Sequence, residues 1–316
     1  MAKRRILVTG GAGFVGSAMA ERLAQDPDNF VVIVDNLLTG SLVKIPTNDH
    51  GNIRFIKCDC NRYPDISGVF FGHQFDFVFH YAALVGVKRT LANPVKVLED
   101  IEGINNILTL SKNTGVKRVY FSSSSEVYGE PVEFPQNEET TPLNSRLPYA
   151  IVKNVGEAYL KSFQREYGLE FTIFRFFNTY GPKQSKDFVM SRFISMALQN
   201  QDITVYGDGS QTRTFCYMND NVDSCYNAFD KNMFVNDVVN VGGNIEIPIV
   251  ELASIIIGIT GSSSKIVHLP ALVEGDMTRR LPDTSKMQQL LNREMTSLED
   301  GIRNVIEKGQ FVSLIQ

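Results

Sequence analysis

The sequence has 316 residues, of which 43% are hydrophobic and 21% are charged. This composition is typical of a globular protein with enough apolar material for one large domain or two of ordinary size. The formal net charge of −4 argues against a nucleic-acid-binding protein, which usually has a basic face.

The first half of the chain alternates short β-branched or aromatic runs with longer helical patterns. Nearly continuous apolar runs of this kind are typical of a parallel sheet that is covered on both faces. The sequence therefore predicts an α/β fold with a Rossmann-type, doubly wound parallel sheet. The predicted strands are residues 4–10, 30–35, 52–59, 75–82, 116–124 and 169–177.

The pattern changes after about residue 180, where turn-rich stretches and helical patterns replace most of the strands. We expect a first, Rossmann domain over residues 1–180 and a smaller C-terminal α/β lobe over residues 181–316. The chain is expected to return to the first domain around residues 215–243. The apolar stretch 249–261 is too short to cross a bilayer and contains Glu251, so it is interpreted as a buried helix.

The stretch ILVTGGAGFVGSAMAERL is the strongest local signal. A predicted strand ends at Thr9, and a glycine-rich loop then opens a predicted helix. Such a loop lets the backbone approach a pyrophosphate, which rests on the positive helix N-terminus. A dinucleotide site is therefore predicted, and its loop residues are Gly10, Gly13, Phe14, Val15 and Gly16.

Asp35 ends the second predicted strand and follows Gly16 by 19 positions. A carboxylate there hydrogen-bonds the 2′-hydroxyl of a ribose and repels a 2′-phosphate, so NAD is predicted rather than NADP. The same cofactor site is also assigned Asn36, Asp59, Ala82, Tyr149 and Lys153.

No signal peptide is expected, because MAKRRILVTG runs directly into a strand and a glycine turn. The four cysteines lack the spacing of a zinc or redox motif, and the four histidines are scattered. We therefore expect reduced thiols, a cytoplasmic protein and no metal site.

PYAIVKNVGEAYLKSF has a helical pattern, which places Tyr149 and Lys153 four residues apart on one helix face. A lysine cation beside a phenol favours its ionised form, so Lys153 is expected to lower the pKa of Tyr149. The pair is then suited to general base catalysis by Tyr149.

Taken together, TGGAGFVG, SSSSEVYG, the Tyr149–Lys153 segment and FFNTYGP resemble the extended short-chain dehydrogenase/reductase family of nucleotide-sugar epimerases and dehydratases. The resemblance covers nearly the whole chain. It implies that C4 of a nucleotide-linked hexose is oxidised transiently and that the hydride is later returned, so that NAD is regenerated. The resemblance further implies that residues 181–316 bind the nucleotide sugar. It also implies that Ser124 hydrogen-bonds the hydroxyl that Tyr149 deprotonates.

Roles of further residues also follow from this resemblance. Asn178 and Arg213 are assigned to the substrate, Arg213 at its diphosphate. Ser122, Ser123 and Tyr128 are interpreted as structural. Lys88 and Arg89 follow the fourth strand, where a substrate loop is expected, and are interpreted either as substrate contacts or as a solvated basic pair.

Ser125 and Glu126 bear on the reaction that follows oxidation. Together with Arg280, they resemble the pattern of UDP-glucuronate decarboxylases, in which serine and glutamate assist at the 4-keto-acid stage. Arg280 is expected to hold the acid's carboxylate in a bidentate fork or to donate a proton. Three features depart from the decarboxylase pattern: Asn154, Asp100 and the loop HYAALVGVKRT.

Decarboxylation of UDP-glucuronate is accordingly favoured narrowly, and 4-epimerisation of a UDP-sugar follows closely. A 4,6-dehydratase remains an alternative, although Ser125 stands where dehydratases acting on dTDP-sugars carry an aspartate. A non-catalytic nucleotide-binding regulator is the remote alternative. Residues 97–112 and 148–167 resemble helices that pair in family dimers, so a homodimer is expected.

Overall fold

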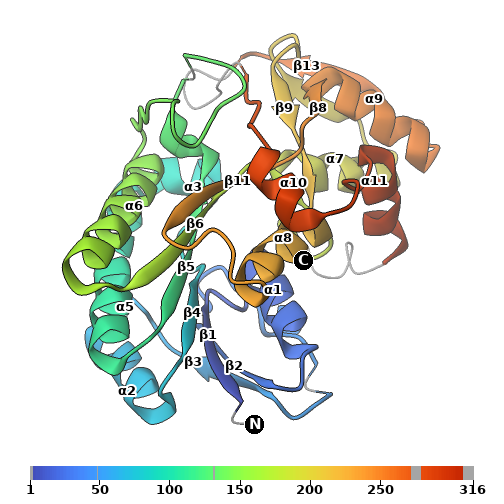
Figure 1. The fold of residues 1–316 in the computed structure, drawn as a ribbon. Helices are drawn as coiled ribbons and strands as arrows, with labels where there is room; N and C mark the ends of the chain where they lie inside the picture. Colours follow the sequence, from blue (N-terminus) through green and yellow to red (C-terminus); the bar gives the residue numbers. More distant parts are fainter. Residues whose placement is uncertain (1–2, 48, 131, 272–278, 309–316) are drawn as a thin grey trace.

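The computed structural model describes residues 3–47, 49–130, 132–271 and 279–308, and a seven-stranded parallel sheet forms its centre (Figure 1). Every neighbouring pair in this sheet runs parallel, which requires a crossover between consecutive strands. In spatial order the strands are β11 (Asp237–Val241), β6 (Glu170–Phe176), β5 (Arg118–Ser124), β4 (Phe77–His80), β1 (Arg4–Thr9), β2 (Asn29–Asp35) and β3 (Ile53–Lys57).

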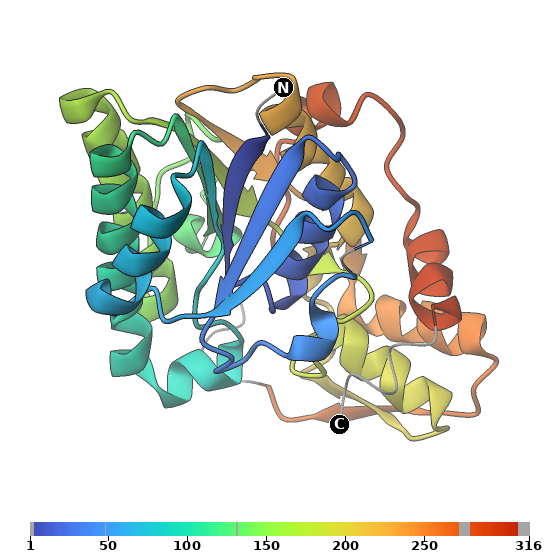
Figure 2. The same cartoon turned by 90° about the horizontal axis from the view of Figure 1, so that it is seen from below.

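Helices cover both faces of the sheet, as the apolar strands predicted (Figures 1 and 2). One face carries α2 (Tyr63–His73), α5 (Asp100–Thr114) and α6 (Pro148–Tyr167), with the short α3 (Val87–Ala92) and α4 (Pro94–Leu98) above them. The other face carries α1 (Phe14–Ala24), α8 (Met218–Asp230) and α10 (Ser285–Leu291). The predicted doubly wound α/β fold is therefore confirmed.

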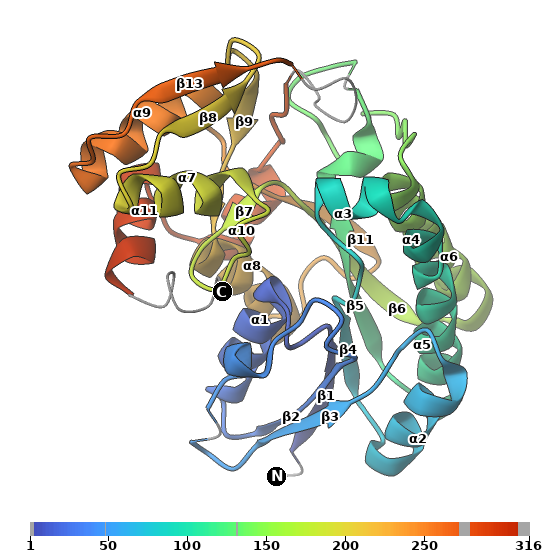
Figure 3. The same cartoon turned by 180° about the vertical axis from the view of Figure 1, so that it is seen from behind.

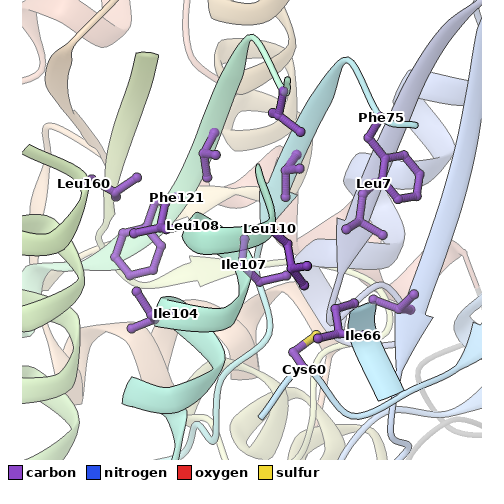
Figure 4. Packing of buried hydrophobic residues seen from close by; sticks show 14 of the residues in the cluster. Leu7, Cys60, Ile66, Phe75, Ile104, Ile107, Leu108, Leu110, Phe121 and Leu160 are labelled. Carbon is purple, nitrogen blue, oxygen red and sulfur yellow. The ribbon is translucent and has the colours of Figure 1, made fainter. Parts of the chain in front are cut away.

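The core beneath α5 and α6 is closely packed (Figure 4). Ile104 and Ile107 of α5, Phe121 of β5 and Leu160 of α6 are all almost fully buried. Burying each such side chain contributes about 1.5–3 kcal/mol. This packing fixes α6, which carries Tyr149 and Lys153, against the strand that ends at Ser124.

The remaining elements form a second lobe at the carboxyl ends of the strands (Figure 3). Its own apolar core joins the helices α7, α9 and α11 to short strands. The elements are β7 (Thr179–Tyr180), α7 (Val189–Leu198), β8 (Ile203–Tyr206), β9 (Thr212–Thr214), β10 (Cys216–Tyr217), β12 (Glu246–Pro248), α9 (Ile249–Thr260), β13 (Ile266–Leu269) and α11 (Leu298–Glu307). Two 3₁₀ turns complete the chain, η1 (Leu42–Lys44) and η2 (Ser125–Tyr128).

The chain returns from the second lobe to the main sheet, because β11 pairs with β6. The domain boundaries at residues 180 and 181 themselves stay a prediction. The apolar stretch that begins at Ile249 forms α9, whose buried side chains pack in the second lobe. None of the helices in the described ranges has the length and hydropathy needed to span a bilayer.

A buried ion pair joins α6 to the sheet. Arg175 of β6 donates two hydrogen bonds, of 2.9 and 2.7 Å, to Glu157 of α6, and both side chains are at most 2% exposed. Ser123 donates to the same carboxylate at 2.6 Å, and Tyr128 accepts from Arg175 at 2.8 Å. Ser123 and Tyr128 thus make the buried structural contacts that were expected of them.

Replacing Glu157 with Leu should lower the free energy of unfolding by about 3–5 kcal/mol, because Arg175 is left charged and buried without its partner. The double variant Glu157→Leu/Arg175→Met should recover much of this loss. Urea unfolding of the two variants tests the pair. Asp187→Leu is the matched control, since Asp187 pairs with Arg89 at 2.8 Å and these side chains are 44% and 36% exposed. A double variant as unstable as the single one would contradict the prediction.

Candidate active site

A cavity of about 710 Å³ opens at the carboxyl ends of the central strands, between the sheet and the second lobe. Ligands bind at this edge in doubly wound sheets. The cavity brings together residues that lie far apart in the sequence, including the glycine loop, the serines at the end of β5, the start of α6 and Arg280.

The glycine loop forms one end of the cavity. Gly10 has a φ of +66°, and a Cβ there would lie 2.7 Å from the backbone nitrogen of Ala82. α1 begins at Phe14, and its N-cap residue, Gly13, has no side chain to cap the free amide groups. These amides are suited to a pyrophosphate. The predicted loop residues all line the cavity, as does Ala82.

Asp35 lies at the same end, 8% exposed. Its carboxylate accepts hydrogen bonds from the amides of Ala12 at 3.0 Å and Leu37 at 2.8 Å. Burial raises the pKa of Asp35, while these amides oppose the rise. Asn36 and Asp59 also line the cavity and are joined by a hydrogen bond of 3.2 Å. The residues present therefore fit a dinucleotide with a free ribose 2′-hydroxyl.

Ser124 and Tyr149 meet in the middle of the cavity. β5 ends at Ser124, and Tyr149 is the second residue of α6. Their hydroxyls are hydrogen-bonded, and this contact lowers the pKa of Tyr149. Burial is the larger effect and raises that pKa above its ordinary value, with the nearby charges of Glu126 and Asp100 acting in the same direction. The sequence-based expectation that Lys153 lowers the pKa of Tyr149 did not account for this desolvation.

Lys153 is 3% exposed, one turn along α6 from Tyr149. Its ammonium lies 5.8 Å from the centre of the Tyr149 ring and donates a hydrogen bond of 3.5 Å to Ser122. Burial lowers the pKa of Lys153 to about 8, although the charge of Asp100 partly offsets the shift. Proton transfer near neutral pH is therefore within reach of this lysine.

A second polar cluster lies beside this pair. Arg280 donates to Ser125 at 2.9 Å and to Glu126 at 2.7 Å. The other carboxylate oxygen of Glu126, Oε2, is buried and makes no hydrogen bond within the described ranges. The cluster therefore offers a charged acceptor and a guanidinium to whatever occupies the cavity.

The segment that carries Arg280 is fixed by the chain that follows η2. The amide of Gln136 donates to Leu281 at 2.7 Å, and the amide of Asp283 donates to Gln136 at 2.8 Å. The side chain of Asn137 adds a bond of 3.0 Å to Asp283. Arg280, distant in sequence, is thereby held against Ser125 and Glu126.

Of the two residues predicted to bind only the substrate, one lies at the cavity and the other does not. Asn178 lines the cavity. Arg213 does not, and its guanidinium donates instead to the carbonyl of Thr212 at 2.7 Å. The diphosphate contact assigned to Arg213 stays a prediction. Arg89 lines the cavity and pairs with Asp187 at 2.8 Å.

Asp100 and Lys44 are among the cavity residues that the sequence did not identify as site residues. Asp100 accepts from the amide of Leu84 at 2.7 Å, and burial raises its pKa. Lys44 stands in the otherwise apolar run LVKIP. Its charge in such a run is the sequence feature that could have identified it as a site residue.

The four cysteines are free and buried. Burial raises the pKa of Cys58 to about 12, which makes its thiol unreactive. Within the described residues, no group of three or more histidine, cysteine or acidic side chains is arranged to hold a metal ion.

Comparison with known proteins identifies the family to which the chain belongs. Residues 6–242 match the model of the NAD dependent epimerase/dehydratase family. The chain is 37% identical to a UDP-N-acetyl-alpha-D-glucosaminuronate decarboxylase of Bacillus cytotoxicus, over 96% of this chain and 97% of the relative. It is 35% identical to UDP-glucuronic acid decarboxylase 1 of Danio rerio, over 96% of this chain and 72% of that protein.

A similar solved structure is a UDP-glucose 4-epimerase of Thermotoga maritima with UDP-glucose. It has a TM-score of 0.89 and 31% identity, and the match covers 98% of this chain and 99% of that one.

Lys153→Met should raise the free energy of unfolding at pH 7 by about 3–3.5 kcal/mol, at about 1.4 kcal/mol per unit of pKa shift. Its pKa falls from 10.5 to about 8 on folding, so the cost of burying the charge is fully present below pH 8. Between these values only the unfolded chain holds the proton, so wild-type stability rises with pH and the gain disappears above pH 10.5.

Urea unfolding from pH 7 to 10 measures this difference. The exposed Lys161 of the same helix supplies the control, Lys161→Met. A destabilised Lys153→Met variant with no dependence on pH would contradict the prediction.

Proposed function

Because the chain belongs to the NAD-dependent epimerase/dehydratase family, we propose that it decarboxylates a UDP-hexuronate after transient oxidation at C4. It is an enzyme, and NAD is its cofactor. Bound NAD supplies the acceptor for the C4 hydride and returns the hydride later. The glycine loop would hold the pyrophosphate of NAD, and Asp35 would hold its adenosine ribose.

Tyr149 accepts the proton of the C4 hydroxyl, and Ser124 orients that hydroxyl between the two side chains. Tyr149 has a raised pKa, so its phenolate needs nearby positive charge. Lys153 supplies such charge in its protonated form, which predominates below a pKa of about 8.

The product of oxidation is a β-keto acid. Its C5–C6 bond breaks, carbon dioxide leaves, and the electron pair moves onto the C4 oxygen as an enolate. Tyr149 and Ser124 donate hydrogen bonds to that oxygen. A proton then adds to C5, and C4 is reduced again, so the net change is loss of carbon dioxide and uptake of one proton.

The Ser125–Glu126–Arg280 cluster is the observation that carries this proposal. Arg280 can hold the carboxylate of the substrate in a bidentate fork. Glu126 lies 2.7 Å from the same guanidinium, so its charge repels the bound acid. Loss of carbon dioxide removes this repulsion, which favours the bond-breaking step.

A UDP-hexose 4-epimerase is the second candidate. Its support is the likeness to the Thermotoga maritima structure, whose match covers nearly all of both chains. Epimerisation would use Ser124, Tyr149 and Lys153 in the same way. It does not require an arginine that binds a substrate carboxylate. In that case Arg280 and Glu126 form a structural pair.

Purified protein with NAD should release carbon dioxide from UDP-glucuronate or from UDP-N-acetylglucosaminuronate labelled at C6. NMR and mass spectrometry would identify the UDP-pentose or its N-acetylated counterpart. UDP-glucose is the parallel substrate. An isomer of unchanged mass from UDP-glucose, without carbon dioxide from either acid, would replace the proposal with the epimerase.

Glu126→Gln should slow carbon dioxide release about a hundredfold or more, in the range of an acid–base or charged group acting in the transition state. It should also lower KM, since the repulsion between Glu126 and the substrate acid is removed. Arg279→Gln is the matched control, because Arg279 pairs with Glu246 at 2.6 Å on the surface. Equal effects of the two substitutions would assign Glu126 a structural role.

The protein is further proposed to be a cytoplasmic homodimer. Its four free, buried cysteines support the compartment. α5 and α6 lie side by side on one outer face of the molecule (Figures 1 and 3), and Ile151 of α6 is 38% exposed there.

Ile151→Glu should convert the dimer to a monomer, because it places a charge in the contact. Sedimentation velocity over a wide concentration range measures the mass. A monomer mass for the unsubstituted chain at every concentration would exclude the dimer.

A further inference from the structure

Lys44 is a buried cation at the glycine-loop end of the cavity. It ends the 3₁₀ turn η1 and is only 8% exposed, a rare degree of burial for a lysine. Its side chain lines the cavity together with Asp35, Asn36 and Thr39. The cations at the other end, Lys153 and Arg280, serve the sugar site described above.

The turn that carries Lys44 is held in place from three sides. The amide of Ser41 donates to the carbonyl of Ala12 in the glycine loop at 2.9 Å. Gly40 packs directly on the Asp35 carboxylate, where a Cβ would lie 2.6 Å from Oδ1. Lys183 donates to the carbonyl of Lys44 at 3.3 Å. The position of Lys44 is therefore a fixed part of the cavity wall.

The charge of Lys44 is poorly compensated. Asp35 attracts the ammonium and Lys183 repels it, and burial lowers the pKa of Lys44. Among the described residues, no carboxylate comes within ion-pair distance of the ammonium. The Asp35 carboxylate already accepts two amide hydrogen bonds. A buried charge without an ion-pair partner costs several kcal/mol, so this position favours an anion in the cavity.

We infer that Lys44 binds a phosphate group of the dinucleotide at its adenosine end. The neighbouring start of α1 offers backbone amides to the same anion, and the first turn of α1 contains no acidic residue. Lys44 adds a full positive charge to these partial ones. The phosphate is one of the pyrophosphate of NAD, because the neighbouring Asp35 carboxylate repels a 2′-phosphate.

This assignment concerns the cofactor alone. It holds whether the bound sugar is decarboxylated or epimerised, so its failure and the failure of the proposed reaction are distinguishable.

Calorimetric titration of the full chain with adenosine, ADP, NAD and NADP tests the assignment. Lys44→Met should weaken ADP and NAD about ten- to a hundredfold, as expected for a hydrogen bond to a charged group. Adenosine, which has no phosphate, should bind unchanged. Lys57→Met is the control, because Lys57 is exposed on β3 opposite Asp35 and does not line the cavity.

The pattern of losses identifies the phosphate. Weaker binding of ADP and NAD supports the pyrophosphate contact, whereas a loss confined to NADP would overturn it in favour of a contact to the 2′-phosphate. Lys44→Arg should restore most of the affinity in either case, because it keeps the charge. Equal weakening of adenosine and ADP, or no weakening of any ligand, would overturn the inference. Thermal melting of each variant verifies that it is folded.

Discussion

The buried pair of Glu157 and Arg175 determines how the rest of the site is assembled. Arg175 lies on β6 and Glu157 on α6, and the pair joins the helix that carries Tyr149 and Lys153 to the sheet. Ser123, next to Ser124 on β5, donates to the same carboxylate at 2.6 Å. A shift of this pair would therefore change the distance between Ser124 and Tyr149, on which proton transfer depends.

Desolvation controls the chemistry of the site. In the same cavity, burial raises the pKa of Tyr149 and lowers that of Lys153. A phenol and an ammonium have similar pKa values in water, about 10 and 10.4, and burial moves these values apart because both shifts favour the neutral form. The neutral phenol and the neutral amine are therefore favoured, and forming the phenolate of Tyr149 requires added positive charge in the cavity. The charges of Asp100 and of the cofactor decide which form predominates.

The sequence predicted the fold well because its signals are local. The apolar strands, the helical periodicity and the glycine loop can each be recognised within a short stretch of sequence. Together they predicted a parallel sheet covered by helices on both faces. The Tyr149–Lys153 spacing was equally local. The net pKa shift of Tyr149 was not predictable, because it depends on burial by elements far away in the sequence. Arg213 and Lys44 show the same limit, since their positions depend on strand pairing and on loop contacts.

The contact between Arg280 and Glu126 is compatible with either of the two candidate reactions. A neutral sugar leaves the 2.7 Å pair closed, and its two charges compensate each other inside the protein. An acidic sugar competes with Glu126 for the guanidinium and places two carboxylates around one cation. Like charges so close raise the free energy of the bound acid, and losing carbon dioxide relieves it. In the proposed reaction the cluster assists decarboxylation, and it is also compatible with a neutral hexose, so neither candidate reaction requires a rearranged Ser124–Tyr149–Lys153 set.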